Sequence, residues 1–173
     1  MGRARAVVWV EAVGGPRRPP VRSTGVVRIA EVTDIDDVVV EGLVRLVPQL
    51  SSSASLPTAD TLAEVAAAPV TRLLVARDDG GRVVGTLTLA VFRIPSGVRA
   101  WIEDVVTDEA ARGQGVGESL TRRAVELAAQ AGARSVELTS RPSREAANRL
   151  YARMGFQRRD TNVYRLDLAA EPG

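Results

Sequence analysis

The amino-acid sequence predicts a single mixed α/β domain in which a twisted sheet is flanked by helices. Three observations indicate this fold class. Three β-rich segments separated by short turns precede residue 108, a glycine-rich turn at 112–117 opens an amphipathic helix, and a further strand, helix and strand follow. Strands and helices that alternate along the chain are typical of a sheet covered by helices.

The first part of the domain predicts one strand and two helices. Residues 26–32 are rich in β-branched side chains and predict the strand. The two helices are bounded by polar capping residues and by prolines, which do not continue a helix. We expect these helices at 35–47, after Thr33 or Asp34 and before Pro48, and from Thr58 or Asp60 to about Ala68, before Pro69.

A three-stranded antiparallel meander is predicted next. Its strands cover 72–77, 83–94 and 98–107, where apolar and β-branched residues are frequent. The DDGGR sequence at 78–82 is typical of a hairpin turn, and PSG at 95–97 predicts a second turn.

The glycine-rich turn leads into the clearest helix of the chain. Its apolar stripe consists of Leu120, Ala124, Leu127, Ala128 and Ala131. Gly132 stands where the end of a helix favours glycine. Because a helix joins the two strands, we expect the strand at 134–139 to run parallel to the strand at 98–107.

One more helix and one more strand complete the prediction. Ser143 is expected to cap the helix, and Gly155 to end it. Alternating apolar residues at 163–168 predict the final strand.

Composition excludes several classes of protein. The apolar content of 45% and the charged content of 25% are those of a globular domain. No apolar run approaches the roughly 18 residues of a membrane span. The sequence has no cysteine and no histidine, which removes thiolate chemistry, the commonest general base and the commonest metal ligand. We therefore expect a cytoplasmic protein without a metal ion or a membrane partner.

Basic character is concentrated at the front of the chain. Residues 1–25 form a Pro/Gly/Arg-rich extension that we expect to be flexible, ahead of a domain at 26–168 and a tail at 169–173. Aromatic residues make up only 3% of the chain. A basic patch interleaved with aromatic side chains is therefore not expected, and neither is a nucleic-acid partner.

The glycine-rich turn predicts an anion site. Gly113, Gly115 and Gly117 alternate immediately before the helix. Glycine permits left-handed backbone conformations and lets a ligand approach closely. The start of a helix adds unpaired N–H groups and partial positive charge, so phosphate oxygens are the expected ligands.

Two motifs give the chain a resemblance to a known family. Residues 112–117 have the spacing Arg-x-x-Gly-x-Gly, and LYARMGF at 150–156 is similar to a Leu-Tyr-x-x-x-Gly-Phe signature. In this order they resemble the pyrophosphate loop and the closing helix of the GNAT superfamily, the N-acetyltransferases that bind acetyl-coenzyme A. The resemblance implies a GNAT fold of six or seven strands, with a V-shaped opening between two strands for acetyl-CoA.

The resemblance also implies a set of cofactor contacts. The pantetheine arm of the cofactor is expected to pair with the strand edge around Val105 and Val106, like an added strand. The expected cofactor-binding residues are Val105, Val106, Thr107, Arg112, Gly113, Gln114, Gly115, Val116, Gly117, Arg144 and Asn148. Many family members carry an asparagine where this sequence has Arg144, so that contact departs from the family pattern.

Acetyl transfer to an amine requires a base for the ammonium ion and benefits from an acid for the leaving thiolate. By resemblance we favour Glu103 as the base, with Asp104 as the second choice, and Tyr151 as the acid. A backbone N–H near Val106 would polarise the thioester carbonyl. With no cysteine and no histidine-activated nucleophile, we expect direct transfer in a ternary complex. The alternative interpretation makes the carboxylates surface charges and the tyrosine a core residue.

The acceptor is left open by the sequence. IEDVV at 102–106 and QLS at 49–51 resemble segments of glucosamine-6-phosphate N-acetyltransferases, whereas Thr139 stands where those enzymes have an aspartate. A small-molecule amine, such as an amino sugar or a polyamine, is the expected acceptor. A protein or peptide amine is one alternative, and a non-catalytic acyl-CoA sensor or interaction module is another. Many relatives form homodimers, and the sequence does not decide this point.

Overall fold

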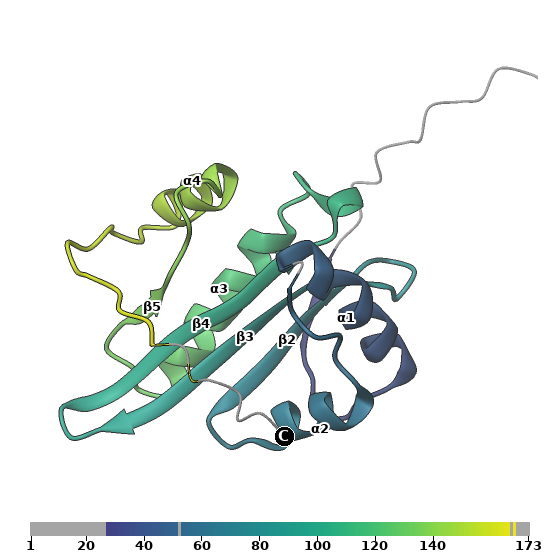
Figure 1. Ribbon diagram of the computed structural model, residues 1–173, viewed down its shortest axis with the longest axis horizontal. Coiled ribbons are helices and arrows are strands. Elements are labelled where there is room, and N and C mark those ends of the chain that lie inside the picture. The colour runs from purple at the N-terminus through teal and green to yellow at the C-terminus, as the bar shows by residue number, and fades with distance from the viewer. Residues whose placement is uncertain (1–26, 52, 167, 169–173) are drawn as a thin grey trace, which may run out of the picture.

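A computed structural model describes residues 27–51, 53–166 and 168 of the chain. The basic extension and the tail predicted at 1–25 and 169–173 lie outside the described residues. Five strands form one sheet in the order β1-β2-β3-β4-β5 (Figure 1). The strands are β1 (Arg28–Glu31), β2 (Thr71–Arg77), β3 (Val83–Ile94), β4 (Gly97–Thr107) and β5 (Val136–Leu138). The first four are antiparallel to their neighbours, and β5 runs parallel to β4, as predicted.

Helices cover both faces of the sheet (Figure 1). They are α1 (Asp37–Leu50), α2 (Ala59–Ala67), α3 (Val116–Gln130) and α4 (Glu145–Arg153), with a short 3-10 helix at Glu109–Ala111. α1 and α2 pack on one face and α3 on the other, while α4 follows β5 at one side of the molecule. The mixed α/β fold class predicted from the sequence is therefore confirmed. None of the helices in the described residues has the length and the apolar character that a membrane span requires.

Each face of the sheet has its own hydrophobic core. On the α3 face, the predicted helix stripe is buried through Leu120, Ala124 and Ala128, which lie against Leu87 and Ile102 of the sheet. A second core fills the α1 and α2 face. It contains Val39, Leu43, Leu46, Leu62, Leu73, Val75, Val83 and Val106.

Two glycines let the helices approach the sheet closely. A Cβ atom at Gly42 of α1 would lie 2.6 Å from the Cβ of Val83. A Cβ atom at Gly85 of β3 would lie 2.7 Å from Cγ1 of Val116, the first residue of α3. Real Cβ atoms do not approach other carbons so closely, so a larger residue at Gly85 would push the start of α3 away from the sheet.

Three predicted helix boundaries are wrong by a few residues. Asp36, and not Thr33 or Asp34, caps α1, because its carboxylate accepts a 2.7 Å hydrogen bond from the Val39 N–H. Arg144 stands at the start of α4 in place of Ser143, and no side chain caps that helix.

Pro48 does not end α1, which continues to Leu50. Leu50 packs against the core on this face, and that packing favours continuation of the helix through the two residues after the proline. The Gln49 side chain also holds this turn, because it donates to the Arg45 carbonyl and accepts a hydrogen bond from the Glu109 N–H.

The final strand predicted at 163–168 is not formed in the described part of the chain, and the sheet has five strands there instead of six or seven. Residues 157–166 have no regular structure. Val163, Tyr164 and Leu166 are at least 76% exposed, so no neighbouring strand among the described residues covers these apolar side chains. The strand predicted at 134–139 is also shorter, at 136–138.

A buried carboxylate joins three separate elements behind the end of β4. Asp108 is only 5% exposed and accepts hydrogen bonds from Arg45 of α1, at 3.0 Å, and Arg82 of the β2–β3 turn, at 3.1 Å. It also accepts one from the Ala110 N–H and so caps the 3-10 helix. Burial raises the pKa of Asp108, but the Ala110 N–H and the two guanidinium groups outweigh it and hold the pKa below its ordinary value.

We predict that Asp108→Asn lowers the free energy of unfolding by about 2 kcal/mol at neutral pH, because two partly buried charged hydrogen bonds to a buried carboxylate lose their acceptor charge. A lowered folded pKa makes the contribution of Asp108 complete above about pH 4, and it is lost as the pH falls toward the folded pKa. Urea unfolding of both proteins should therefore show a difference that shrinks in acid.

Glu109→Gln is the matched control for this experiment. Glu109 forms an exposed ion pair with Arg112, and such pairs contribute little to stability. Equal losses in the two variants would contradict the role assigned to Asp108.

Candidate active site

The candidate site begins at an open strand edge. β4 pairs with β5 only from Ala100 to Ile102. Among the residues that the structure describes, β4 continues beyond Ile102 to Thr107 with β3 as its only partner strand. The backbone groups on the other side of residues 103–107 therefore face the opening between β4 and β5, which is the V-shaped opening that the sequence predicts.

A bulge interrupts β4 within this open segment. Thr86 lies opposite Val106, whereas Thr88 lies opposite Glu103, so one residue of β3 faces two residues of β4. Asp104 is in this bulge, with a left-handed φ of 52°. An aspartate is among the few residues other than glycine that adopt this conformation at modest cost.

The bulge has two consequences for this part of β4. Adjacent residues of a regular strand face opposite sides of the sheet, but the bulge breaks this alternation, so the spacing of Glu103 and Asp104 alone does not place them on opposite faces. It also moves Val106 into the core beneath α1, while Val105 packs on the α3 side with Ile102. Both carboxylates are exposed.

Glu103 has a fixed neighbour that sequence reasoning did not select. The indole Nε1–H of Trp101 donates to Glu103 Oε1 at 2.6 Å. The two residues are separated by one position on the strand, so their side chains lie on the same face. That spacing is the signal that points to Trp101, and the contact holds the Glu103 carboxylate in one orientation.

The glycine-rich turn has the geometry of an anion site. Gly113 and Gly115 both have φ of 78°, in the left-handed region, and no atom lies within 4 Å of a Cβ built on either. Gly115 is the N-cap of α3 and has no side chain to accept a hydrogen bond from the first turn. The N–H groups of this turn lack intrahelical acceptors, so they are available to an anion.

Other predicted residues of this turn are exposed or serve the fold. The Arg112 side chain is exposed and pairs with Glu109 at 3.2 Å. Gln114 donates to the Ala110 carbonyl, which braces the turn. Val116 is buried in the core. A ligand can therefore meet Val116 only through its backbone.

Gly117 lies where three elements meet. A Cβ atom built on Gly117 would lie 3.4 Å from Leu150 of α4 and 3.6 Å from the Thr107 hydroxyl at the end of β4. This places the start of α3, the end of β4 and the middle of α4 at one point. Thr107 is half-buried there, and the Val106 side chain beside it is buried.

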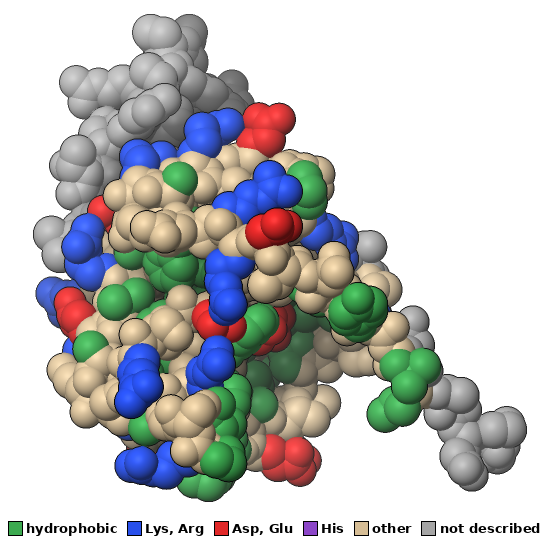
Figure 2. All heavy atoms as spheres, turned by 90° about the vertical axis from the view of Figure 1, so that its left-hand side faces the viewer, with side chains coloured by type: hydrophobic (Ala, Val, Ile, Leu, Met, Phe, Trp, Pro, Cys, Tyr) green, Lys and Arg blue, Asp and Glu red, His purple; other side chains and the backbone are tan. Residues whose placement is uncertain are grey.

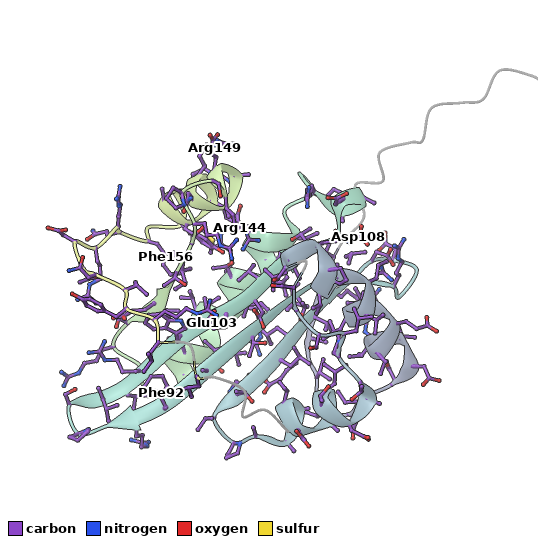
Figure 3. The ribbon with its side chains drawn as sticks, viewed as in Figure 1. Phe92, Glu103, Asp108, Arg144, Arg149 and Phe156 are labelled. Carbon is purple, nitrogen blue, oxygen red and sulfur yellow. The ribbon has the colours of Figure 1, made fainter. Side chains whose placement is uncertain are left out.

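α4 contributes two polar residues to the same region. Arg144 Nη2 donates to the carbonyl of Val105 at 3.0 Å and so spans the opening between α4 and β4. Asn148 donates to the Arg141 carbonyl at 2.9 Å, so its amide nitrogen already holds the segment before the helix. Figure 3 shows Arg144 extending from the start of α4 toward β4, while Arg149 stands on the outer side of the helix.

Tyr151 is the most buried polar residue of α4. It is 7% exposed, and its ring packs edge-to-face on Phe156 with centroids 5.8 Å apart. Burial raises the pKa of Tyr151, and the positive charge of Arg144 partly opposes that rise. The phenol is therefore protonated at neutral pH and can donate a proton.

Tyr151 also lines a pocket of about 1130 Å³ beside β5. The same pocket is lined by Trp101, Glu137, Thr139, Ser140 and Asn148. Glu137 there accepts hydrogen bonds from both Arg99 and Arg159, each at 2.9 Å. Figure 2 views the molecule from the β5 and α4 side and shows arginines spread among acidic side chains over this face.

The structure thus brings together the open edge of β4, the glycine-rich turn and Tyr151, all from segments that the sequence selects. It adds Trp101, Asp108 and Gln49 as residues that position them. Asp108 follows a strand and precedes Glu-Ala-Ala, a capping pattern that would have indicated it. Across the part of the chain that the structure describes, no cluster of three acidic residues could hold a metal ion.

Comparison with known proteins finds matches over most of the chain. The profile of the acetyltransferase (GNAT) family matches residues 46–156. A probable glucosamine 6-phosphate N-acetyltransferase 2 from Oryza sativa subsp. japonica is 34% identical over 140 residues, which cover 75% of this chain and 80% of that protein.

Solved structures share the fold. A putative acetyltransferase from Agrobacterium tumefaciens str. C58 is 28% identical, with a TM-score of 0.69 over 82% of this chain and 99% of that chain. The aminoglycoside acetyltransferase meta-AAC0020, from an uncultured soil metagenomic sample, has a TM-score of 0.72 at 19% identity, over 83% of this chain and 97% of that chain.

The environment of Tyr151 can be tested by titration. The sequence has two tyrosines, so Tyr164→Phe leaves Tyr151 as the only one. We predict that its phenol, followed by tyrosinate absorbance, titrates above the ordinary value of about 10, because the ring is buried. Adding Arg144→Ala should raise the midpoint further. A midpoint that Arg144→Ala leaves unchanged would contradict the proximity of the guanidinium, provided that circular dichroism shows an intact fold.

Proposed function

Because this chain belongs to the acetyltransferase (GNAT) family and is an acyltransferase, we propose that it transfers an acetyl group from acetyl-CoA to a primary amine of a small molecule. The observation that carries this proposal is the open edge of β4, which leads directly into a glycine-rich turn at the start of α3. Acetyl-CoA contains an extended, amide-bearing pantetheine arm that is joined to a diphosphate. The arm matches the open strand edge, and the diphosphate matches the glycine-rich turn that follows it.

The cofactor's diphosphate would lie on the turn at 112–117. Its oxygens would accept hydrogen bonds from the free N–H groups around Gly113 and Gly115, and the partial positive charge of the helix start favours them. The pantetheine arm would then run along residues 105–107 as an added strand. Val106 and Val116 would contribute backbone groups only, since their side chains are buried.

The acceptor amine must lose a proton before it attacks the thioester. An alkylammonium has a pKa of about 10, so a base is needed at neutral pH. We assign this role to Glu103, acting directly or through one water. The hydrogen bond from Trp101 supports the assignment, because it fixes a carboxylate on the strand where the thioester would lie. Asp104, in the bulge, is the second choice.

Direct attack of the amine nitrogen on the thioester carbon gives a tetrahedral oxyanion. A backbone N–H near Val106 would stabilise it. As this intermediate collapses, the attacking nitrogen loses its extra proton to water, the C–S bond breaks and the new amide remains with the acceptor. Tyr151 would give its proton to the departing thiolate, a role that its raised pKa keeps available at neutral pH.

The acceptor is assigned by chemistry to small primary amines. The pocket of about 1130 Å³ that Tyr151 and Trp101 share is slightly larger than the usual small-molecule site of up to about 1,000 Å³. The name of the rice relative points to an amino-sugar phosphate as its substrate, and that class and the polyamines are our first candidates here. The pocket residue Glu137 would favour a cationic acceptor, although Arg99 and Arg159 share its charge.

A thiol-release assay tests the proposed function. The purified chain and acetyl-CoA would be mixed in turn with glucosamine 6-phosphate, polyamines, aminoglycosides, amino acids and short peptides. Release of free CoA with a small amine supports the proposal, and release only with peptides would replace it by peptide acetylation. Silence across the panel, with acetyl-CoA binding intact by calorimetry, would favour the acyl-CoA sensor.

We predict that Glu103→Gln lowers kcat by about 100-fold or more, because general-base assistance has that magnitude. The affinity for acetyl-CoA, measured by calorimetry, should stay nearly constant. Asp104→Asn is the matched variant, since it removes one charge from the adjacent residue of the same strand. A larger loss of kcat in Asp104→Asn would reverse the two roles.

Tyr151→Phe should lower kcat by about 10-fold or more while the affinity for acetyl-CoA stays nearly constant. The loss is moderate because the leaving thiol has a pKa of about 8.5 and needs a proton only late in the reaction. Tyr164→Phe removes the same hydroxyl from an exposed position and serves as the control. Unchanged turnover in Tyr151→Phe would remove that residue from the mechanism.

A further inference from the structure

Arg144 occupies a backbone acceptor on the open edge of β4. Its Nη2 atom donates to the Val105 carbonyl at 3.0 Å. Val105 lies in the segment of β4 that, among the described residues, has no partner strand on the side of β5. An amide N–H that pairs with β4 from this side must approach the same carbonyl, so the guanidinium and a pantetheine amide compete for the same space.

The contact lies between the two halves of the candidate site. Along β4, the pocket residue Trp101 comes first, Val105 follows, and Thr107 reaches the glycine-rich turn beside Gly117. Strand residues are spaced by about 3.3 Å. The Arg144 guanidinium therefore stands between the pocket, which is assigned to the acceptor, and the turn, where the diphosphate would lie.

The charge of Arg144 is not balanced by a carboxylate. Ten ion pairs occur among the described residues, and Arg144 is in none of them. On the same helix, Arg149 pairs with Glu145 at 3.2 Å. A guanidinium held only by a neutral carbonyl gains more from a phosphate, which offers charged oxygens in a matching geometry.

We propose that Arg144 is a specificity residue that closes the β4 edge in the free protein and releases it only to a thioester that carries phosphate. The inference rests on the proposed function, since it takes acetyl-CoA as the ligand of this edge. A diphosphate at the glycine-rich turn draws the guanidinium away from Val105 and frees the carbonyl for the pantetheine arm. A phosphate-free acyl thioester has to break the same contact without that compensation.

Two other roles for Arg144 predict different results. A simple phosphate ligand would leave the affinity for a phosphate-free thioester unchanged when Arg144 is removed. A structural link between α4 and β4 would lower the affinity for every ligand when it is lost. A phosphate-free thioester is expected to bind more tightly without Arg144 only if the guanidinium covers the Val105 carbonyl in the free protein and must be displaced by the ligand.

The test compares two probes by isothermal titration calorimetry on the full chain. Acetyl-CoA carries the diphosphate, and S-acetyl-pantetheine lacks all phosphate. We expect Arg144→Ala to bind S-acetyl-pantetheine about threefold more tightly and acetyl-CoA about tenfold more weakly than the wild type, from the net worth of one hydrogen bond and of one charged hydrogen bond. Arg149→Ala removes the same charge from the outer side of α4 (Figure 3) and should leave both affinities unchanged.

Unchanged or weaker binding of S-acetyl-pantetheine to Arg144→Ala would overturn the inference, while thermal unfolding confirms that the variant is folded. In that case wild-type binding of acetyl-CoA would still stand, and the proposed function with it. A wild-type chain that binds neither probe would overturn the proposed function, and this inference would fall together with it.

Discussion

The loss of a partner strand beyond Ile102 is the constraint on which the rest of the site depends. A strand in the middle of a sheet needs hydrogen-bonding partners on both sides, and within the described part of the chain β4 has only β3 as a partner strand from Glu103 to Thr107. Backbone groups that are left without a strand must find side chains, water or a ligand. In this molecule the Arg144 side chain donates to one of these backbone groups, the Val105 carbonyl. The opening between β4 and β5 can bind a ligand because the backbone groups along its β4 edge are not paired with a strand.

An unpaired strand edge can bind a ligand in a defined position only if the strand itself is rigid. Contacts on the other side of β4 provide this rigidity. Asp108 binds α1 and the β2–β3 turn to the residue that follows β4, and Gln49 of α1 accepts a hydrogen bond from the next N–H along the chain. Gly85 lets the first residue of α3 sit directly on β3. The glycine-rich turn is therefore fixed at both ends, although its own glycines impose few constraints.

Local sequence patterns predicted most of the helices and strands, but they could not predict contacts between residues that are far apart in the chain. The β3 strand was predicted with its observed bounds, and α3 with its buried stripe, because turn residues and apolar periodicity act over a few positions. Two local signals gave wrong predictions. Pro48 was expected to end α1, but the packing of Leu50 favours a longer helix, and the alternating segment at 163–168 was expected to be a strand, but it has no partner strand among the described residues. The glycine-rich turn was identified from its spacing, whereas the contact of Arg144 with β4 joins residues 39 positions apart.

The bulge at Asp104 has a consequence for how this segment tolerates change in length. One extra residue at that point moves the side chains of β4 to the opposite face, so Ile102 belongs to the core under α3 and Val106 to the core under α1. A deletion of the extra residue would give regular pairing with Glu103 opposite Thr88 and Val106 opposite Thr86, so Ile102 and Val106 would keep their present faces. An insertion of one more residue between Ile102 and Val106 has no such solution, because it would either enlarge the bulge or turn Val106 away from the core under α1.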